Sequence, residues 1–335
     1  MPRLSRRHAI AGAALLAAPA LIGRARAAST LKISTSYPND PVFAAGRVWY
    51  DIFLPHLKAT TGDQIAIQYY PDNQLGQEAD IANQVKLGVV DIMLTGSSIW
   101  TNLVPEFGVF DMGYVFKDYD HMRRATATPA GAGLQKLLLQ KTGTHLPAWG
   151  RNAGARNFMT KFAFSKPEDL AGKKIRSLPS PIVTETVKLM GAAATPMAFG
   201  EIYTGLQAGV IDGLEHDAPT VLSAKFYETA KHFTLTRHIH TPFGAFVSDR
   251  SLQKLKPDVR DGLLKAIQQT TDDQYARFAA LETAAEDELK KHEVTIADCD
   301  RDAFRERVRP LWAQFLQATP GAKDMLDAAQ KTESA

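Results

Sequence analysis

The sequence contains a single cysteine, Cys299, and this scarcity excludes several kinds of site. One thiol cannot form an internal disulfide, and it cannot build a zinc centre of several thiolates. The neighbouring carboxylates of Asp298, Asp300 and Asp302 are expected to raise the pKa of the thiol, which disfavours the reactive thiolate. The lone cysteine therefore argues against a disulfide scaffold, a thiolate metal centre and a cysteine nucleophile.

The chain also lacks a true excess of positive charge. It has 39 basic and 36 acidic side chains, but residues 1–27 contribute five arginines and no acid, which leaves 34 bases against 36 acids in the remainder. A protein that binds nucleic acid keeps its positive charge in the folded domain. We therefore expect no nucleic-acid partner.

Catalytic and cofactor signatures are missing as well. The sequence has no G-x-S-x-G, H-E-x-x-H, G-x-x-x-x-G-K-[ST] or G-x-G-x-x-G motif. His238 and His240 are the one candidate metal pair, but a third ligand has no evident position, and a partly exposed pair at a strand end is the preferred interpretation. We expect no cofactor, no metal and no enzymatic activity.

The N-terminal segment has the composition of an export signal. Arg6 and Arg7 follow Ser5, residues 9–22 form a weakly apolar stretch, and residues 25–27 read Ala-Arg-Ala, a small-x-small cleavage site. The paired arginines favour a twin-arginine signal in residues 1–27, with an ordinary Sec signal as the alternative. Since no later stretch is long and apolar enough to span a bilayer, we expect a soluble, periplasmic protein.

The remaining pattern predicts two α/β lobes. In the first, strands at 31–35, 65–69 and 89–94 alternate with helices at 41–60 and 77–87, an order typical of a largely parallel sheet. The pattern restarts after Pro147, with strands at 156–159, 174–177 and 210–213 and helices at 181–190 and 201–208. Residues 258–292 then predict one helix about 50 Å long, enough to span both lobes.

Charged residues near the predicted strands suggest a ligand site. Glu215, His216 and Asp217 follow the strand predicted at 210–213, and ligands of open α/β sheets bind at the carboxyl ends of strands. The alternative is a solvated loop with Asp217 as a helix cap. Arg156 and Arg176 lie in apolar strands, where a guanidinium needs either an internal carboxylate or an anionic ligand.

Several motifs in order resemble the DctP family of TRAP-transporter solute-binding proteins, over about residues 30–318. They are Tyr70-Pro71-Asp72-Asn73-Gln74-Leu75-Gly76, Val90-Asp91-Ile92, residues 167–176 (P-E-D-L-A-G-K-K-I-R), residues 194–203, residues 206–213 and Lys225-Phe226-Tyr227-Glu228. The resemblance implies a two-lobe periplasmic binding protein fold with a long helix spanning both lobes. The lobes would comprise 28–153 with about 242–281, and 154–241 with about 282–318, followed by a C-terminal tail at 319–335.

The resemblance also implies a set of ligand contacts. Arg176 takes the position of the family's carboxylate-binding arginine, Arg156 that of a second contacting arginine, and Phe199 that of an aromatic residue packed on the ligand. The family's frequent G-x-E-N stretch reads Gly213-Leu214-Glu215-His216 here, so His216 replaces an asparagine. In the first lobe we expect contributions from residues that follow the predicted strands: Tyr37, Asp40, Ser97, Ser98 and Trp100.

The predicted function is capture of a small organic acid and its delivery to a TRAP membrane permease by a monomer. Two alternatives stay open at this point. One is a binding protein that presents its closed form to a signalling receptor. The other is a secreted α/β enzyme that uses Glu215 and His216 as acid/base groups.

Overall fold

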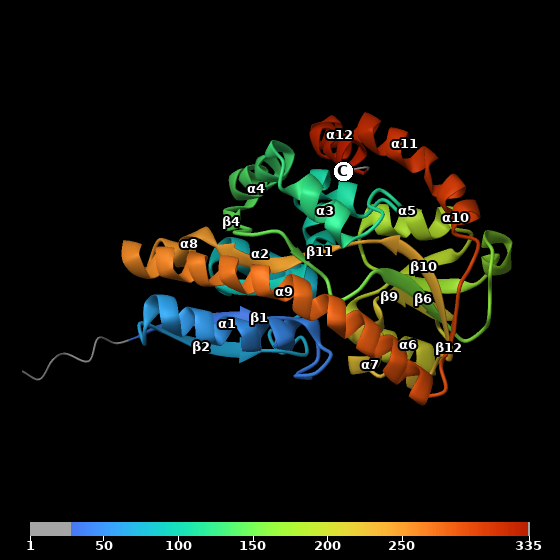
Figure 1. The fold of residues 1–335 in the computed structure, drawn as a ribbon, viewed down its shortest axis with the longest axis horizontal. Helices are drawn as coiled ribbons and strands as arrows, with labels where there is room; N and C mark the ends of the chain where they lie inside the picture. The colour runs from blue at the N-terminus through green and yellow to red at the C-terminus, as the bar shows by residue number, and fades with distance from the viewer. Residues whose placement is uncertain (1–27, 334–335) are drawn as a thin grey trace, which may run out of the picture.

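The structure, a computed structural model, describes residues 28–333, so the export signal predicted in residues 1–27 lies outside the described residues. Its strands form two separate sheets (Figure 1). The first has the order β2-β1-β3-β11-β4, with β5 also paired to β11, and the second has the order β12-β10-β6-β9-β7-β8. We call the first sheet with its helices lobe I and the second lobe II.

The strand bounds show how the chain divides between the sheets. Lobe I contains β1 (Ser29–Ser34), β2 (Ile65–Tyr70), β3 (Ile92–Gly96), β4 (Thr144–His145), β5 (Gly150–Arg151) and β11 (Pro242–Ser248). Lobe II contains β6 (Arg156–Thr160), β7 (Lys174–Ser177), β8 (Ala193–Pro196), β9 (Gly213–His216), β10 (His232–Ile239) and β12 (Thr295–Ala297). Both sheets are mixed, because β11 runs antiparallel to β3 and β6 runs antiparallel to β9 and β10.

Helices cover both sheets. The α-helices are α1 (Ala45–Thr61), α2 (Glu78–Leu87), α3 (Tyr119–Thr126), α4 (Pro129–Thr142), α5 (Pro181–Leu189), α6 (Ile202–Gln207), α7 (Ala218–Ser223), α8 (Asp249–Leu252), α9 (Pro257–Lys291), α10 (Arg301–Val308), α11 (Pro310–Ala318) and α12 (Lys323–Thr332). Short 3-10 helices are η1 (Ser97–Asn102), η2 (Pro105–Phe110), η3 (Pro167–Leu170), η4 (Phe199–Glu201), η5 (Phe226–Glu228) and η6 (Pro320–Ala322).

The predicted long helix is confirmed. Helix α9 has 35 residues and packs on α1 of lobe I and on α7 of lobe II (Figure 1). Its buried positions include Leu263 and Ile267 near one end and Leu281 and Leu289 near the other. One continuous helix thus contributes apolar side chains to the cores of both lobes.

The C-terminal residues 319–333 are more ordered than the predicted tail. They contain α12, which packs against α3 and α4 and buries Met325 and Leu326. In Figure 1, α10, α11 and α12 arch from lobe II back to lobe I. This arch joins the lobes in addition to α9 and to the crossovers between β5 and β6 and between β10 and β11.

Two predictions of local structure were wrong. The strand expected at 210–213 begins at Gly213, so Glu215 and His216 lie within β9 and not in a loop after it; Val210 instead lies at an exposed turn. His238 and His240 are both buried, not partly exposed. In both cases polar residues were expected to face solvent, but the structure buries them.

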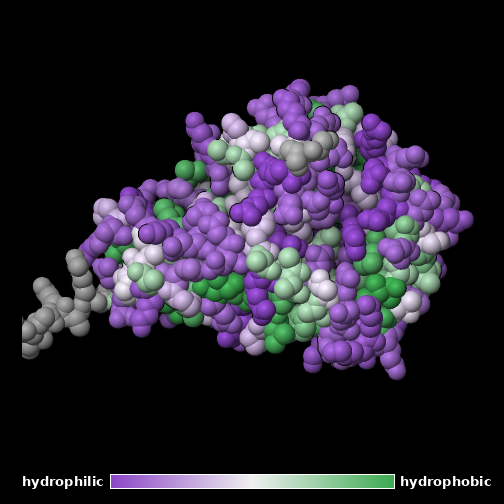
Figure 2. Space-filling model, in the orientation of Figure 1, coloured by the Kyte–Doolittle hydropathy of each residue, from purple (hydrophilic) through white to green (hydrophobic). Residues whose placement is uncertain are grey.

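The surface has the character of a water-exposed protein on the side seen in Figure 2, which is mostly hydrophilic with small scattered apolar areas. Among residues 28–333, no helix is both long and apolar enough to cross a bilayer.

Candidate functional site

A small cavity lies between the lobes, at the carboxyl ends of parallel strands from both sheets. From lobe I it is lined by Ser36, Tyr37, Glu78, Thr95, Gly96 and Ile99, and from lobe II by Arg156, Arg176, Leu178, Phe199 and His216. Asn152 and Thr241, where the chain crosses between the sheets, complete the lining. Residues at the carboxyl ends of β1, β3, β7 and β9 therefore meet here, the usual place for a ligand in α/β proteins.

Arg176 is the unsatisfied charge of this cavity. It lies on β7, which begins after a turn at Gly172, where φ is +74°. Its Nε donates to the carbonyl oxygen of Met197 at 2.9 Å, but its buried Nη1 has no hydrogen-bond partner among the described residues. Burial and the charge of Arg156 lower the pKa of Arg176 to about 10, although Glu215 acts in the opposite direction. The group therefore stays charged at neutral pH, and no carboxylate of residues 28–333 forms an ion pair with it.

Arg156 is equally buried but fully paired. It forms a two-pronged ion pair with Glu215, in which its Nη2 lies 2.8 Å from Oε1, and Nη2 also donates to the Glu215 carbonyl oxygen at 2.9 Å. Burial alone would raise the pKa of Glu215, but Arg156 and His238 outweigh it and hold that pKa well below its usual range. Glu215 itself does not line the cavity; it holds Arg156 in place from behind.

His238 completes this buried group. Its Nε2 lies 3.7 Å from Glu215, and its Nδ1 is 2.8 Å from the hydroxyl of Thr236. Burial lowers the pKa of His238 more than Glu215 raises it. Arg156, Glu215 and His238 therefore form an internal network that explains both buried charges, whereas Arg176 has no such explanation.

His216 is oriented by the residue that follows it. Its Nδ1 lies 2.7 Å from Oδ2 of Asp217, which also accepts from Nδ2 of Asn152 at 3.1 Å. Asp217 caps α7 through the backbone N–H of Thr220, as the helix-cap interpretation predicted. Nδ1 also lies 3.0 Å from the backbone N of Asp217, so Asp217 engages this ring nitrogen through both its carboxylate and its backbone. Burial and Arg156 lower the pKa of His216. Nε2 forms no hydrogen bond with any residue in the described part of the chain, and His216 lines the cavity.

Lobe I supplies a carboxylate and two hydroxyls. The hydroxyls of Ser36 and Thr95 both donate to Oε1 of Glu78, each at 2.9 Å. Glu78 is the first residue of α2, where a negative charge is favoured by the helix dipole. This fixed carboxylate faces a cavity that also holds the guanidinium of Arg176, so the two lobes present opposite charges.

Aromatic rings close the cavity on one side. Tyr37 and Phe199 are both buried, with ring centroids 6.0 Å apart, and each also packs edge-on against His216. The Tyr37 hydroxyl lies 3.5 Å from Oδ1 of Asn152. Because Tyr37 comes from lobe I and Phe199 from lobe II, this contact ties the lobes together over the cavity.

The cavity is much smaller than an organic acid requires. It encloses about 20 Å³, room for about one water molecule. Pockets that hold small ligands usually measure roughly 300–1,000 Å³. The structure is thus closed, and a ligand can enter only if the lobes separate or the lining side chains move.

Four of the predicted lobe I residues lie outside this lining. Trp100 is fully buried and stacks on Phe246 in the core, with ring centroids 4.7 Å apart. Ser97 is fully buried, and Ser98 donates to Asp111. Asp40 accepts from the backbone N–H groups of Val42 and Phe43 before α1. Of the predicted residues, the structure brings Tyr37, Arg156, Arg176, Phe199 and His216 together at the cavity.

Two polar residues of the cavity were not predicted, Glu78 and Asn152. Glu78 lies two residues after Gly76, where the first motif of the resemblance ends, so that motif stopped short of it. Asn152 lies in a crossover segment with no periodic pattern, and nothing in the sequence marked it.

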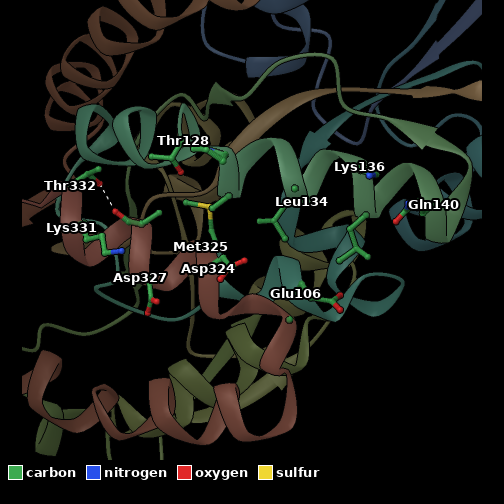
Figure 3. Close-up of a pocket in the computed structure, with 16 residues that line it drawn as sticks. Glu106, Thr128, Leu134, Lys136, Gln140, Asp324, Met325, Asp327, Lys331 and Thr332 are labelled. Carbon is green, nitrogen blue, oxygen red and sulfur yellow. Dashed lines mark hydrogen bonds between the residues drawn. The ribbon is translucent and has the colours of Figure 1, made fainter.

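A larger groove elsewhere does not have the chemistry of an anion site. It encloses about 700 Å³ between α4 and α12 (Figure 3). Its charged residues are of both signs, with Glu106, Asp324 and Asp327 against Lys136 and Lys331. No arginine lines it, so it offers no fork for a carboxylate.

Comparison with known proteins identifies the family. The model of the DctP family, described as bacterial extracellular solute-binding protein, family 7, matches residues 50–318. The chain belongs to this family. The DctP-family chain is 30% identical over 80% of its length to the C4-dicarboxylate-binding periplasmic protein DctP of Rhodobacter capsulatus, covering 78% of that protein. It is 29% identical over 86% of its length to the sialic acid-binding periplasmic protein SiaP of Vibrio cholerae, covering 91% of it.

The fold is shared with solved structures of TRAP periplasmic solute-binding proteins. One from a Polaromonas species, crystallised with D-erythronate, is 30% identical, with a TM-score of 0.83 over 90% of this chain and 98% of the other. The predicted two-lobe α/β fold with its long helix is therefore confirmed, and so is the predicted place of the chain among TRAP solute-binding proteins. Its relatives are substrate-binding proteins of transport systems.

Proposed function

We propose that this DctP-family protein captures a small hydroxylated carboxylate in the periplasm and hands it to a TRAP membrane permease. The observation that carries the proposal is the buried Nη1 of Arg176, which has no partner among residues 28–333 although it lines the cavity between the lobes. A carboxylate from outside supplies the missing acceptor and the missing charge together. We propose that Arg156 contributes a further hydrogen bond along the cavity wall.

The other groups of the cavity suit hydroxyls on the same ligand. His216 offers Nε2, Glu78 accepts through its carboxylate, and Asn152 has an amide. Tyr37 and Phe199 would pack on the carbon skeleton. Relatives support this class, because they are described with D-erythronate, sialic acid and C4-dicarboxylates, which are all small carboxylates.

We further propose that the protein acts as a monomer and leaves its ligand chemically unchanged. The cavity contains one carboxylate, an imidazole and two guanidinium groups, but the sequence holds none of the nucleophile or cofactor motifs sought above. Incubation with the best ligand, followed by mass spectrometry, should return that ligand intact. Steady conversion at catalytic protein concentrations would refute the proposal of binding without turnover.

The ligand itself is found by a thermal-shift screen of organic acids. At 100 times its dissociation constant a ligand adds about 2.7 kcal/mol to the free energy of unfolding, which gives a clear rise in melting temperature. Sugar acids, hydroxy acids and dicarboxylates should be compared with the matching neutral sugars and polyols. Equal stabilisation by the neutral compounds would argue against a carboxylate site.

A further inference from the structure

A second cavity, which shares no lining residue with the first, carries a strong positive charge. It encloses about 450 Å³ under the arch formed by α10, α11 and α12 over β10. Its basic residues are Lys117, Arg237, Arg301, Arg305 and Arg309, and its only acidic lining residue is Glu333. In Figure 2 the surface over α10 is hydrophilic.

Most of this charge has no ion-pair partner within residues 28–333. Arg305 donates to Asp302 at 2.7 Å, but the side chains of Arg237, Arg301 and Arg309 form no hydrogen bond or ion pair with any residue in the described part of the chain. The other exposed arginine of α10, Arg307, pairs with Glu168 on the opposite side of the helix. The unpaired arginines are thus concentrated on the side that faces the cavity.

The helix brings these charges together. Arg301 and Arg305 lie on α10 and Arg309 is its C-cap residue, and their spacing of four residues places them along one side. The N-terminus of α10 is itself capped by Asp300 and has Asp302 in its first turn, so the helix dipole is already met by carboxylates of the chain.

The backbone around the cavity is also held in an unfavourable conformation. Tyr114 and Arg237 both line the cavity and both have left-handed backbone angles, with φ of 63° and 44°. Hydrogen bonds from their backbone N–H groups maintain this: Tyr114 donates to the His238 carbonyl at 2.7 Å and Arg237 to the Asn157 side chain at 2.8 Å. Left-handed conformations of such residues are uncommon and tend to occur at functional sites.

The floor of the cavity suits the carbon skeleton or the edge of a small molecule. Tyr114, Phe116 and Trp312 line it beneath the arginines. The hydroxyl of Tyr114 is buried and has no hydrogen-bond partner within residues 28–333. The Tyr114 hydroxyl is therefore available as a hydrogen-bond donor at the base of the cavity, and several guanidinium groups are available at its rim.

We propose that this cavity binds a small polyanion, a molecule with two or more carboxylate or phosphate groups. Its size lies within the range of small-molecule sites, and several guanidinium groups match several anionic groups. A flat contact with an anionic membrane would need the charges but not the enclosed volume or the aromatic floor. The site shares no lining residue with the cavity of Arg176, so it does not depend on the proposed function.

The test is calorimetric titration with citrate and with pyrophosphate, at an ionic strength matched with sodium chloride. The protein carries Arg176→Ala, so that binding at the first cavity does not contribute. Saturable binding of one polyanion per protein is expected. The double variant Arg301→Gln/Arg309→Gln, in the same background, should weaken it roughly tenfold or more, because two charge-assisted contacts are lost.

The matched control removes two exposed arginines, Arg250 of α8 and Arg277 of α9, as Arg250→Gln/Arg277→Gln. It loses the same net charge and should bind citrate like its parent. Arg301→Lys/Arg309→Lys keeps the charge and should bind between the two extremes. Melting temperatures without anion should agree among these variants, since all the substituted side chains are exposed.

Several results would overturn the proposal. They are equal losses in the control and in the cavity variant, binding that follows ionic strength alone, or citrate binding that disappears with Arg176→Ala. Saturable binding to phosphatidylglycerol vesicles through the same arginines, with no citrate binding, would replace the small polyanion by a membrane surface. Conversely, if Arg176→Ala bound the organic acid as tightly as the wild type, the proposed function would be refuted and the polyanion site would be unaffected.

Discussion

The two arginines between the lobes are alike in burial but differ in what they contact. Arg156 meets a carboxylate of the chain itself, whereas the Nη1 of Arg176 meets no acceptor within residues 28–333. A buried guanidinium cannot relax by losing its proton at physiological pH. The difference in pairing therefore assigns different tasks to residues that the sequence presented as equivalent.

Replacing Arg176 should reduce affinity strongly. Arg176→Ala removes the guanidinium fork and should cost roughly 2–5 kcal/mol of binding free energy, or about 30- to 5,000-fold in Kd. Arg176→Lys keeps the charge and should restore only part of this loss. The measurement is calorimetry with the best acid from the thermal-shift screen, with Arg277→Gln as a surface control and circular dichroism to confirm folding. If Arg176→Lys bound the acid with wild-type affinity, the proposed two-pronged contact between the guanidinium and the carboxylate would be wrong.

Replacing Glu215 should instead reduce stability. Glu215→Gln leaves Arg156 charged and unpaired in the interior, at a cost of about 3–5 kcal/mol in the free energy of unfolding. Asp51→Asn, which breaks the exposed pair with Arg47, should change it by less than about 1 kcal/mol. Urea unfolding at pH 7 compares the two. A small effect for Glu215→Gln would mean that water reaches Arg156.

The same variant has a defined pH dependence. The pKa of Glu215 is held well below its usual value, so its contribution is fully present above about pH 4.5 and is lost as the pH falls toward the folded-state pKa. The difference in unfolding free energy between wild type and Glu215→Gln should therefore shrink below about pH 4.5. A difference that stays constant down to pH 3 would show that the ionised carboxylate is not the stabilising group.

The sequence was informative about residues where a motif placed them on a strand. Arg156 and Arg176 were identified because charge in an apolar strand needs an explanation, and His216 because it was expected at the carboxyl end of a strand. All three line the cavity. Trp100 and Ser97 were assigned to the cleft because they follow a strand, yet the chain turns there into η1 and buries them in lobe I. The direction of a loop after a strand depends on tertiary packing, and no local pattern encodes it.

At the scale of elements, α9 fixes the segment that crosses between the lobes. Gln274 donates to the carbonyl oxygen of Arg151, and Glu282 accepts from Nη2 of Arg151 and from the backbone N–H of Ala155. The helix thus holds the crossover on both sides of Asn152, which lines the cavity. The length of α9 was predictable from helix propensity. Its hydrogen bonds to the crossover were not, because the bonded residues lie more than 100 positions apart in the sequence.

The contact between α9 and α1 depends on a glycine. A Cβ at Gly262 would lie 2.8 Å from the carbonyl oxygen of Thr60, so Gly262→Ala should separate the helices and destabilise the protein by roughly 1–3 kcal/mol. The matched control is Gly133→Ala in α4, where a Cβ meets nothing within 4 Å, and it should stabilise by roughly 0.5–1 kcal/mol. Thermal unfolding gives both values. A neutral Gly262→Ala would show that the two helices separate at little cost.

At the scale of the whole molecule, the small cavity implies motion between the lobes. The closed cavity of about 20 Å³ cannot admit an organic acid as it stands, and we expect the lobes to separate when the ligand enters. Small-angle scattering should give a radius of gyration in saturating ligand close to the value calculated from the structure, and a larger one without ligand. The exposed-surface variant Arg277→Gln should behave identically. An unchanged radius at saturation would indicate rearrangement of side chains instead of lobes.

The order of strands in the first sheet also constrains how the protein is made. Strand β11, at Pro242–Ser248, lies between β3 and β4, so the middle of that sheet is missing until residue 248 has left the ribosome. By then the chain already contains five of the six strands of the second sheet. The N-terminal lobe therefore cannot complete its sheet until most of the second sheet has been synthesised. A nascent chain stalled before residue 242 should expose the unpaired edge of β3 and remain a substrate for chaperones.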